Sequence, residues 1–314
     1  MKFAWLFPGQ GAQTVGMADS ILEVSPAARD VFRRADEALG EPLSELVHSG
    51  PEERLTLTAN AQPAILATSL AFLAALREGF PDFPEPAFAA GHSLGEYSAL
   101  VAAGALTLED AVRLVRIRGT AMQEAVPAGV GAMSAIVGLE ASVVEAICTE
   151  VSLAGEGMCS PANYNAPGQL VIAGHAEAVA RASERVAASG GRAMPLKVSA
   201  PFHSSLMAPV ARVLDTALAR TSVGPLRFPV VANVDATPNA EAASVRGLLV
   251  AQVDAPVRWE ATIRFLVAQG VTHALEIGPG KVLSGLSRRI AKELRVLSVN
   301  DVVSLAQTIT FLGA

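Results

Sequence analysis

A serine stands between two glycines, directly after a short apolar run, in the stretch Phe88-Ala89-Ala90-Gly91-His92-Ser93-Leu94-Gly95. The run predicts a buried strand that ends at Gly91, and a helix is expected to begin after Ser93 and to end at Gly104. At such a turn the hydroxyl is exposed, the glycines avoid Cβ clashes, and the helix amino end can stabilise an oxyanion. Ser93 is therefore the candidate nucleophile, and the alternative is a glycine-flanked turn in which it only caps the helix.

The residues around this motif predict an α/β protein. Residues 3–7 indicate a buried strand that runs into a glycine-rich turn, and helices are expected at 27–39 and 63–76. The tetrapeptide at 107–110 resembles a capping box and should open a helix that runs to about residue 125. Short strands that alternate with helices favour a parallel sheet.

The segment between Gly129 and Lys197 has a different pattern. Its expected order is βαββαβ, which is typical of a small ferredoxin-like unit. The strands are predicted at 132–137, 158–163, 169–173 and 192–198, and the helices at 142–151 and 177–188. We therefore expect a ferredoxin-like subdomain at 127–197, inserted into a larger α/β domain made of residues 1–126 and 198–314.

Composition limits the classes of function. The chain has 314 residues, of which 51% are hydrophobic and 17% charged, and its net charge is −6. A sizeable core is expected, and the negative charge gives no reason to expect nucleic acid or an anionic membrane as a partner. An acidic partner would need a local basic patch.

Targeting and membrane signals are weak. The apolar amino terminus stops at Pro8-Gly9, too early for a signal peptide, and the apolar stretch at 61–76 falls short of the roughly 20 residues of a membrane span. Cys148 and Cys159 are too few for a disulfide framework and are expected to be partly buried thiols in a reducing cytoplasm.

Serine needs a base, and the chain has five histidines. His92 is expected to point away from the neighbouring serine, His48 to lie in a polar loop, His175 in a turn and His273 beside an apparent buried strand. His203 follows the serine in chain order, as in hydrolase-like sheets, and is the favoured base. The alternative is a turn histidine with no catalytic task.

Arg118 lies on the apolar face of its predicted helix, where a charged side chain is unexpected. Its neighbours three and four positions away form the apolar stripe: Leu114, Val115, Ala121 and Met122. A guanidinium out of water needs an anion, and planar pairing with a carboxylate is what arginine does best. Its head could instead reach the surface or meet a carboxylate of the protein. The sharper hypothesis is that the carboxylate arrives with the substrate.

Several motifs in order along the chain resemble one family. They are Phe7-Pro8-Gly9-Gln10-Gly11-Ala12-Gln13, Gly91-His92-Ser93-Leu94-Gly95-Glu96, Arg118-Gly119, Asn163-Tyr164-Asn165-Ala166-Pro167-Gly168-Gln169, Ala200-Pro201-Phe202-His203, Gln252 and Glu276-Ile277-Gly278-Pro279-Gly280. Along essentially its whole length the chain is similar to the malonyl-CoA:acyl-carrier-protein transacylases, the loading enzymes of fatty acid and polyketide synthesis. The resemblance implies a hydrolase-like large domain with the ferredoxin-like insert.

The resemblance also implies roles. Ser93 would form the acyl ester, His203 would act as base, and the main-chain carbonyl of Gln252 would orient the histidine. The backbone N–H groups of Gln10 and Leu94 would form the oxyanion hole. Arg118 would hold the malonyl carboxylate, Phe202 would exclude α-branched acyl groups, and Asn163 is expected among the substrate-binding residues.

The implied mechanism is ping-pong, with malonyl-CoA as donor and the phosphopantetheine thiol of acyl carrier protein as acceptor. No cofactor or metal is expected to be bound, since the chain lacks HExxH, zinc spacing and a Walker loop. A cytoplasmic monomer is expected. The sequence leaves open whether the acceptor serves fatty acid, polyketide or malonate-decarboxylase machinery.

Carrier proteins are acidic, so docking needs a positive surface. The densest basic run is 281–295, and a helix over 283–294 would place Arg288, Arg289 and Lys292 on one face. An ordinary solvated helix face is the alternative.

Two rival functions compete with transfer. One is an acyl hydrolase on the same scaffold, which would have no use for a buried cation if its acyl chains were neutral. The other is a non-catalytic assembly subunit, against which the presence of Ser93, His203 and Gln10 together argues.

Overall fold

The main sheet lies at the centre of the computed structural model, which describes residues 2–127, 129–155, 157–198 and 200–313. Its strand order is β10-β9-β1-β2-β7-β8, and all neighbouring pairs are parallel except β7 and β8. The bounds are β1 (Phe3–Phe7), β2 (Phe88–Gly91), β7 (Val230–Val231), β8 (Pro238–Asn239), β9 (His273–Ile277) and β10 (Arg295–Val299). The parallel sheet predicted from the sequence is confirmed, with one antiparallel edge pair added.

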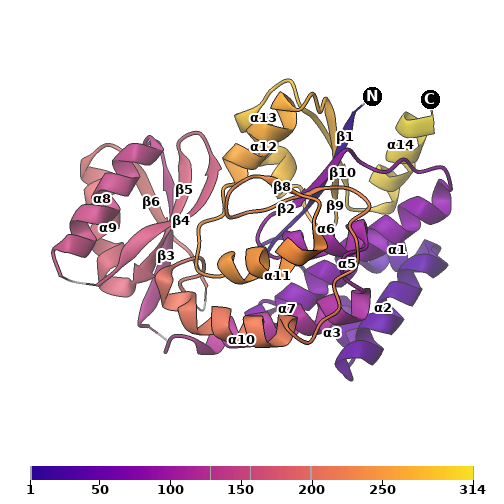
Figure 1. Ribbon diagram of the computed structural model, residues 1–314, viewed down its shortest axis with the longest axis horizontal. Coiled ribbons are helices and arrows are strands. Elements are labelled where there is room, and N and C mark those ends of the chain that lie inside the picture. The colour runs from indigo at the N-terminus through magenta and orange to yellow at the C-terminus, as the bar shows by residue number, and fades with distance from the viewer. Residues whose placement is uncertain (1, 128, 156, 199, 314) are drawn as a thin grey trace.

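Both faces of the main sheet are covered by helices (Figure 1). Trp5 and Phe7 point into the larger core, and the alternate residues Ala4 and Leu6 point into a second core on the opposite face. Burial on both faces explains why β1 is a continuous apolar run instead of an alternating one. The two predicted strands, one just before the serine motif and one at the amino terminus, are confirmed.

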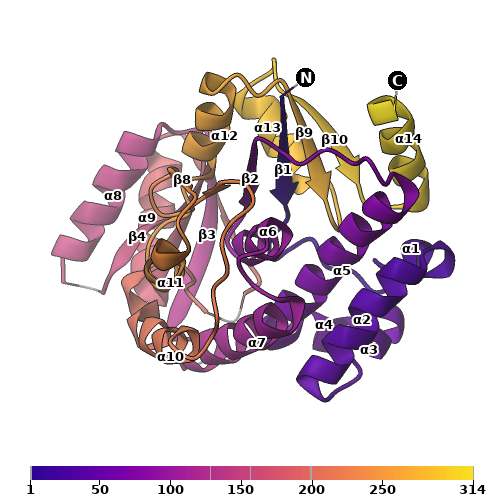
Figure 2. The same cartoon turned by 45° about the vertical axis from the view of Figure 1, so that its right-hand side comes forward.

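The helices over the larger core include α2 (Pro26–Leu39), α5 (Thr58–Gly79), α6 (Gly95–Ala103) and α7 (Leu108–Glu124). α6 lies between the main sheet and helices α5 and α7 (Figure 2). Thr107 caps α7 by accepting a bond from the Asp110 N–H, as the capping pattern predicts.

Helix α5 corrects one expectation. It has 22 residues, so it is long and apolar enough to cross a membrane, contrary to the length inferred from residues 61–76. Within the described chain, 83% of its most apolar window is buried against protein, which is the environment of a core helix.

The remaining helices connect and cover the sheet. They are α1 (Asp19–Val24), α3 (Leu43–Ser49), α4 (Glu52–Leu55), the 3-10 helix η1 (Ser205–Met207), α10 (Ala208–Leu218), α11 (Ala242–Ala251), α12 (Trp259–Ala268), α13 (Val282–Ile290) and α14 (Val302–Gly313). The helix expected over 283–294 ends at Ile290, four residues before the predicted end. The next residue, Ala291, is buried and has the extended backbone of the segment that leads into β10.

A second, antiparallel sheet has the order β4-β5-β3-β6. Its elements follow the predicted βαββαβ sequence: β3 (Gly131–Val137), α8 (Ala141–Leu153), β4 (Cys159–Ala166), β5 (Gln169–His175), α9 (Ala176–Ala188) and β6 (Arg192–Pro195). The last strand ends at Pro195, three residues before the predicted end. The predicted insert also contains residues 128 and 156, which lie outside the described residues, and the domain boundaries themselves stay a prediction.

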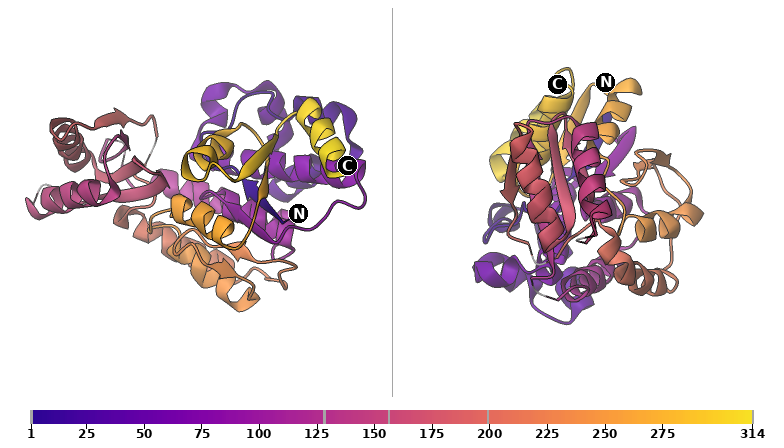
Figure 3. Two further views of the ribbon diagram at one scale, coloured as in Figure 1. Left: turned by 90° about the horizontal axis from the view of Figure 1, so that it is seen from above. Right: turned by 90° about the vertical axis from the view of Figure 1, so that its left-hand side faces the viewer.

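The small sheet is attached to the main domain along one face. α8 and α9 cover its outer face (Figure 3), where Leu170 and Ile172 are buried. The alternate residues Val171 and Ala173 belong to the larger core. β4 also bonds to the main domain, since Tyr164 N–H donates to Val257 O at 2.9 Å. This contact holds β4 beside the carboxyl ends of the main strands.

Candidate active site

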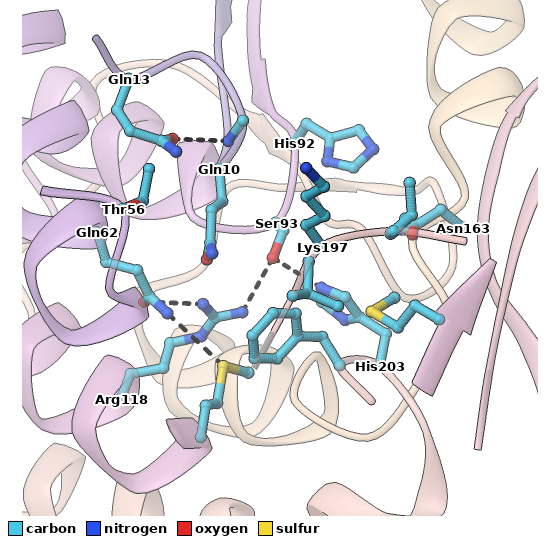
Figure 4. A pocket seen from close by; sticks show the side chains of 16 residues that line it. Gln10, Gln13, Thr56, Gln62, His92, Ser93, Arg118, Asn163, Lys197 and His203 are labelled. Carbon is cyan, nitrogen blue, oxygen red and sulfur yellow. Dashed lines mark hydrogen bonds between the residues drawn. The ribbon is translucent and has the colours of Figure 1, made fainter. Parts of the chain in front are cut away.

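A cavity of about 360 Å³ opens beside the carboxyl ends of β1 and β2 (Figure 4). Gln10 follows β1 and Ser93 follows β2, so two neighbouring parallel strands bring them together. The lining residues are Gln10, Gly11, Gln13, Thr56, Gln62, His92, Ser93, Arg118, Met122, Met133, Asn163, Leu196, Lys197, Val198, Phe202 and His203. Ligands of open α/β sheets bind at this edge.

The turn that carries Ser93 depends on its two glycines. A Cβ on Gly91 would lie 1.9 Å from the carbonyl carbon of Gly95, and one on Gly95 would lie 2.1 Å from Phe7 O. Ser93 itself has a positive φ of 51°, a strained conformation for a residue with a side chain. The strand, the turn and α6 therefore meet closely enough to present the Ser93 hydroxyl to the cavity.

Ser93 and His203 meet across 110 residues of sequence. Ser93 Oγ lies 2.7 Å from His203 Nε2, and His203 Nδ1 lies 2.9 Å from Gln252 O and 3.2 Å from Ala255 O. Both partners of Nδ1 are carbonyl oxygens, which only accept, so Nδ1 carries the proton. Nε2 is then free to accept the serine proton, which is the arrangement that a general base needs.

None of the other four histidines is hydrogen-bonded to Ser93 in the described structure. His92 lines the cavity, but its Nε2 contacts Asn165 Oδ1 at 2.9 Å instead of Ser93. His48 lies in helix α3 and not in a loop, while His175 ends β5 and His273 begins β9.

Burial and the nearby Arg118 charge lower the pKa of His203 to about 3, against the opposing effect of the Gln252 carbonyl. The unfolded chain takes up a proton at this residue near pH 6.5, whereas the folded protein keeps it neutral. Stability is therefore fully present above pH 6.5 and falls as the pH drops towards about 3. A neutral imidazole at neutral pH suits a base.

We expect His203→Asn to be less sensitive to acid than the wild type, and asparagine tolerates the positive φ of 57° at this position. Between about pH 7 and about pH 5 the variant should lose about 2 kcal/mol less free energy of unfolding. Urea titrations of both proteins at the two pH values measure the difference. Parallel losses in the two proteins would show that His203 is not buried in its neutral form.

Two backbone amides close to Ser93 in the fold, those of Gln10 and Leu94, were predicted to form an oxyanion hole. Among the described residues, neither the Gln10 N–H nor the Leu94 N–H has an acceptor, whereas the Ser93 N–H donates to Asn233 Oδ1 at 2.6 Å. Leu94 directly precedes α6, so its amide lies at the positive end of that helix. Two unpaired amides from neighbouring loops are the donors from which an oxyanion hole is made.

Arg118 is 2% exposed, so the sequence-based expectation of a buried arginine is confirmed. Its Nη1 donates to Gln62 Oε1 at 2.9 Å and its Nη2 to Ser93 Oγ at 3.0 Å (Figure 4). Nη2 also donates to Gln252 Oε1 at 2.9 Å. Its Nε has no acceptor in the described part of the chain, and no carboxylate there forms an ion pair with it. The head does not reach the surface, so both alternatives weighed from the sequence are set aside.

Two further predicted residues line the cavity. Phe202 is 9% exposed and lies with Met122 and Met133 in its apolar part. Asn163 is 7% exposed and reaches the cavity from β4, so the small sheet supplies part of the wall.

Sequence reasoning missed three buried polar residues. Gln62 accepts from Arg118, Asn233 bonds the Ser93 turn, and Glu96 accepts from Asn233 N and Gln252 Nε2. Burial raises the pKa of Glu96 to about 7, against the lowering effect of Gln252, Asn233 and Arg118. Two of them had a sequence signal: Glu96 ends the serine motif, and Gln62 is a polar residue in an apolar stretch. Nothing in the sequence marks Asn233.

The predicted docking residues lie apart from the cavity lining. Arg288, Arg289 and Lys292 are exposed, but Lys292 follows the end of α13 and does not share a helix face with the two arginines. Arg289 Nη1 donates to Gln169 Oε1 at 2.6 Å, so α13 also touches the small sheet.

The two cysteines are free, buried and adjacent, with their sulfur atoms 3.7 Å apart. Among the described residues, no group of three or more His, Cys, Asp or Glu side chains is placed to hold a metal ion.

A strained serine after a parallel strand, a histidine oriented by a carbonyl and two free amides define a serine enzyme of acyl transfer or acyl hydrolysis. The chain belongs to the family described as the acyl transferase domain, whose model matches residues 4–308.

Known relatives narrow the comparison. The chain is 48% identical over 301 residues to the malonyl CoA-acyl carrier protein transacylase of Bacillus subtilis strain 168, covering 96% of this chain and 94% of the relative. It is 46% identical over 307 residues to the protein of the same name from Escherichia coli strain K12, covering 97% and 98%.

Solved structures agree with these relatives. An acyl-carrier-protein S-malonyltransferase from Bartonella henselae matches with a TM-score of 0.96 at 46% identity, over 100% of both chains. A malonyl-transacylase solved in complex with its type II polyketide acyl carrier protein matches with a TM-score of 0.95 at 45% identity, over 99% of this chain and 100% of that one. The α/β fold expected from the sequence is confirmed.

Proposed function

We propose that the protein transfers a malonyl group from malonyl-CoA to the phosphopantetheine thiol of an acyl carrier protein, through an ester on Ser93. The observation that carries the proposal is a buried arginine, without an ion-pair partner in the described residues, in the same cavity as the nucleophile. The relatives named as malonyl transacylases support it. The test is whether malonyl-CoA leaves an adduct on the enzyme and whether that adduct passes to holo carrier protein.

The first half-reaction uses the site as follows. His203 Nε2 takes the proton of Ser93 Oγ, and the oxygen attacks the thioester carbonyl carbon. The N–H groups of Gln10 and Leu94 hold the resulting oxyanion. The tetrahedral intermediate then collapses, the carbon–sulfur bond breaks, and His203 returns the proton to the leaving coenzyme A sulfur. Gln252 O keeps the histidine ring oriented throughout.

The second half-reaction runs in reverse with another thiol. His203 takes the proton of the phosphopantetheine thiol, the sulfur attacks the ester carbonyl, and Ser93 leaves with that proton. His203 carries every proton and the two amides stabilise the oxyanion, so the chemistry calls for no bound cofactor or metal. We place this reaction in the cytoplasm, with the enzyme as a monomer.

Arg118 gives the reaction its acyl selectivity. Its guanidinium lies next to Ser93 Oγ, so an ester on that oxygen brings the distal carboxylate of malonyl to the cation. The free Nε–H offers the carboxylate a donor that has no other acceptor among the described residues. Phe202 narrows the apolar side of the same cavity, which disfavours acyl groups branched at the carbon beside the carbonyl.

The carrier protein is proposed to dock over α13. This helix follows a loop in which Gly278 and Gly280 approach Pro8 and Ala12, so α13 begins beside the loop that lines the cavity. Arg288 and Arg289 are exposed near its end, about 10 Å further on. A positive surface at that distance suits an acidic protein whose prosthetic arm must reach Ser93.

We expect the double variant Arg288→Glu with Arg289→Glu to weaken transfer to carrier protein by about tenfold or more, because it replaces two attractive charges with repulsive ones. Acylation of the enzyme by malonyl-CoA should continue, and wild-type transfer should fall as salt rises. Steady-state kinetics with varied carrier protein measure the effect.

A matched control is the pair Arg212→Glu and Arg220→Glu, whose exposed arginines lie in and just after α10, on the opposite side of the molecule (Figure 1). Equal weakening by both pairs would assign the effect to net charge. Unchanged kinetics in the α13 variant would return that surface to an ordinary solvated helix face.

A further inference from the structure

Three buried polar side chains lie behind the Ser93 turn and outside the cavity lining. Glu96 is in the first turn of α6, Asn233 follows β7, and Gln252 follows α11. They are 3%, 1% and 1% exposed. Glu96 Oε2 accepts from both partners, at 3.0 Å from Asn233 N and at 2.8 Å from Gln252 Nε2. One carboxylate oxygen therefore joins two residues from distant parts of the chain.

The Gln252 amide has only one favourable orientation. Its Oε1 accepts from Arg118 Nη2 at 2.9 Å, and its Nε2 donates to Ser93 O at 3.0 Å and to Glu96 Oε2. Reversing the amide would turn its NH₂ group to the guanidinium and its oxygen to two other acceptors. Arg118 cannot accept, and Glu96 Oε2 is held as an acceptor because the Asn233 N–H also donates to it, so the two groups fix the amide from opposite ends.

Asn233 connects the same carboxylate to the nucleophile turn. Its Oδ1 accepts from the Ser93 N–H at 2.6 Å, and its Nδ2 donates to Gly91 O at 2.7 Å. These two bonds hold the backbone from Gly91 to the amide of Ser93, the residue whose φ is 51°. Because Glu96 accepts from the Asn233 main chain, it anchors the residue that holds Ser93 in place.

We propose that Glu96 is a positioning residue for malonyl selection: it acts through the Gln252 side chain to orient Arg118, and through Asn233 to hold the Ser93 backbone. The three groups lie in the order carboxyl, amide and guanidinium, so only the Gln252 side chain separates Glu96 from Arg118. Among the described residues it is the carboxylate that reaches the guanidinium through a single hydrogen-bonded side chain. The inference rests on the proposed function, because its effect is on the malonyl group.

The test compares the rates at which malonyl-CoA and acetyl-CoA acylate the purified enzyme. We expect Glu96→Ala to lower the ratio of malonyl to acetyl rate constants by about tenfold or more, because the released Gln252 amide no longer fixes Arg118. Glu96→Asp should also lower the ratio, since its carboxylate is one methylene short. Glu96→Gln should keep most of the wild-type ratio, since an amide oxygen can still accept from Asn233 N and Gln252 Nε2.

Gln252→Ala and Glu96→Ala form a double-mutant cycle. Gln252→Ala removes the amide and keeps the main-chain carbonyl that orients His203. In this background, removing the Glu96 side chain should cause no further fall in the ratio. Glu276→Gln is the matched control. Glu276 is another buried carboxylate, but it accepts from Leu283 N and Ser284 N, so the change should leave the ratio unaltered.

The outcomes separate the possibilities. An equal fall with both acyl groups, or independent falls in the cycle, would make Glu96 structural and overturn the inference. If Glu96→Ala does not fold, the Asp and Gln variants decide it by the same ratio. A wild type with no preference for malonyl would instead refute the proposed function, and that measurement comes first.

Discussion

Replacing Ser93 with alanine should abolish the malonyl adduct that wild-type enzyme forms with malonyl-CoA. The expected loss is complete, because the ester oxygen is gone and no second nucleophile is paired with His203 in the described site. Intact-mass analysis should show one added malonyl group on the wild type and none on the variant. Peptide mapping should place the group on Ser93.

The control is Ser98→Ala on the same helix. Ser98 is fully buried, and its hydroxyl has no hydrogen-bond partner among the described residues, so its loss should leave both the fold and the adduct intact. An adduct of equal yield on the Ser93 variant would assign the acyl group to another residue.

Replacing Arg118 with alanine should lower malonyl transfer by two or more orders of magnitude. A carboxylate paired with a fully desolvated guanidinium is worth several kcal/mol, and a hundredfold change in rate corresponds to about 3 kcal/mol. The rate with acetyl-CoA, which has no carboxylate, should not share that loss. Rate constants for acylation by both thioesters measure the change.

Arg116→Ala is the matched control, two positions away on α7. Arg116 pairs with Glu41 and Asn60 and does not line the cavity, so it removes a guanidinium without touching the site. Equal losses with both thioesters in the Arg118 variant would make that residue structural and leave the malonyl proposal without its physical support.

The sequence predicted those parts of the fold and site that depend on local patterns. The Ser93 turn follows from glycine spacing, the βαββαβ unit from alternating elements, and the burial of Arg118 from the apolar residues one helical turn away. Each signal lies within about one element of the residue concerned. The pairing of Ser93 with His203 was reached through chain order and resemblance, and the structure brings the two together.

The parts that were missed or misplaced depend on contacts between distant segments. Glu96 and Asn233 meet across 137 residues, and nothing in either neighbourhood marks them as partners. Lys292 was placed on a helix because its spacing is helical, but the burial of Ala291 ends α13 first. Tertiary packing decides such cases, and local periodicity does not record it.

The central claim is that Ser93 carries malonyl from one thiol to another, and a single-turnover chase tests it most directly. Wild-type enzyme is loaded with malonyl-CoA, freed of the thioester and mixed with holo or apo carrier protein, and both proteins are weighed by intact mass. We predict that the enzyme loses one malonyl group and that the holo carrier gains it, while the apo carrier gains nothing. Loss of the adduct as free malonate, at the same rate with or without holo carrier, would identify a hydrolase and contradict the account.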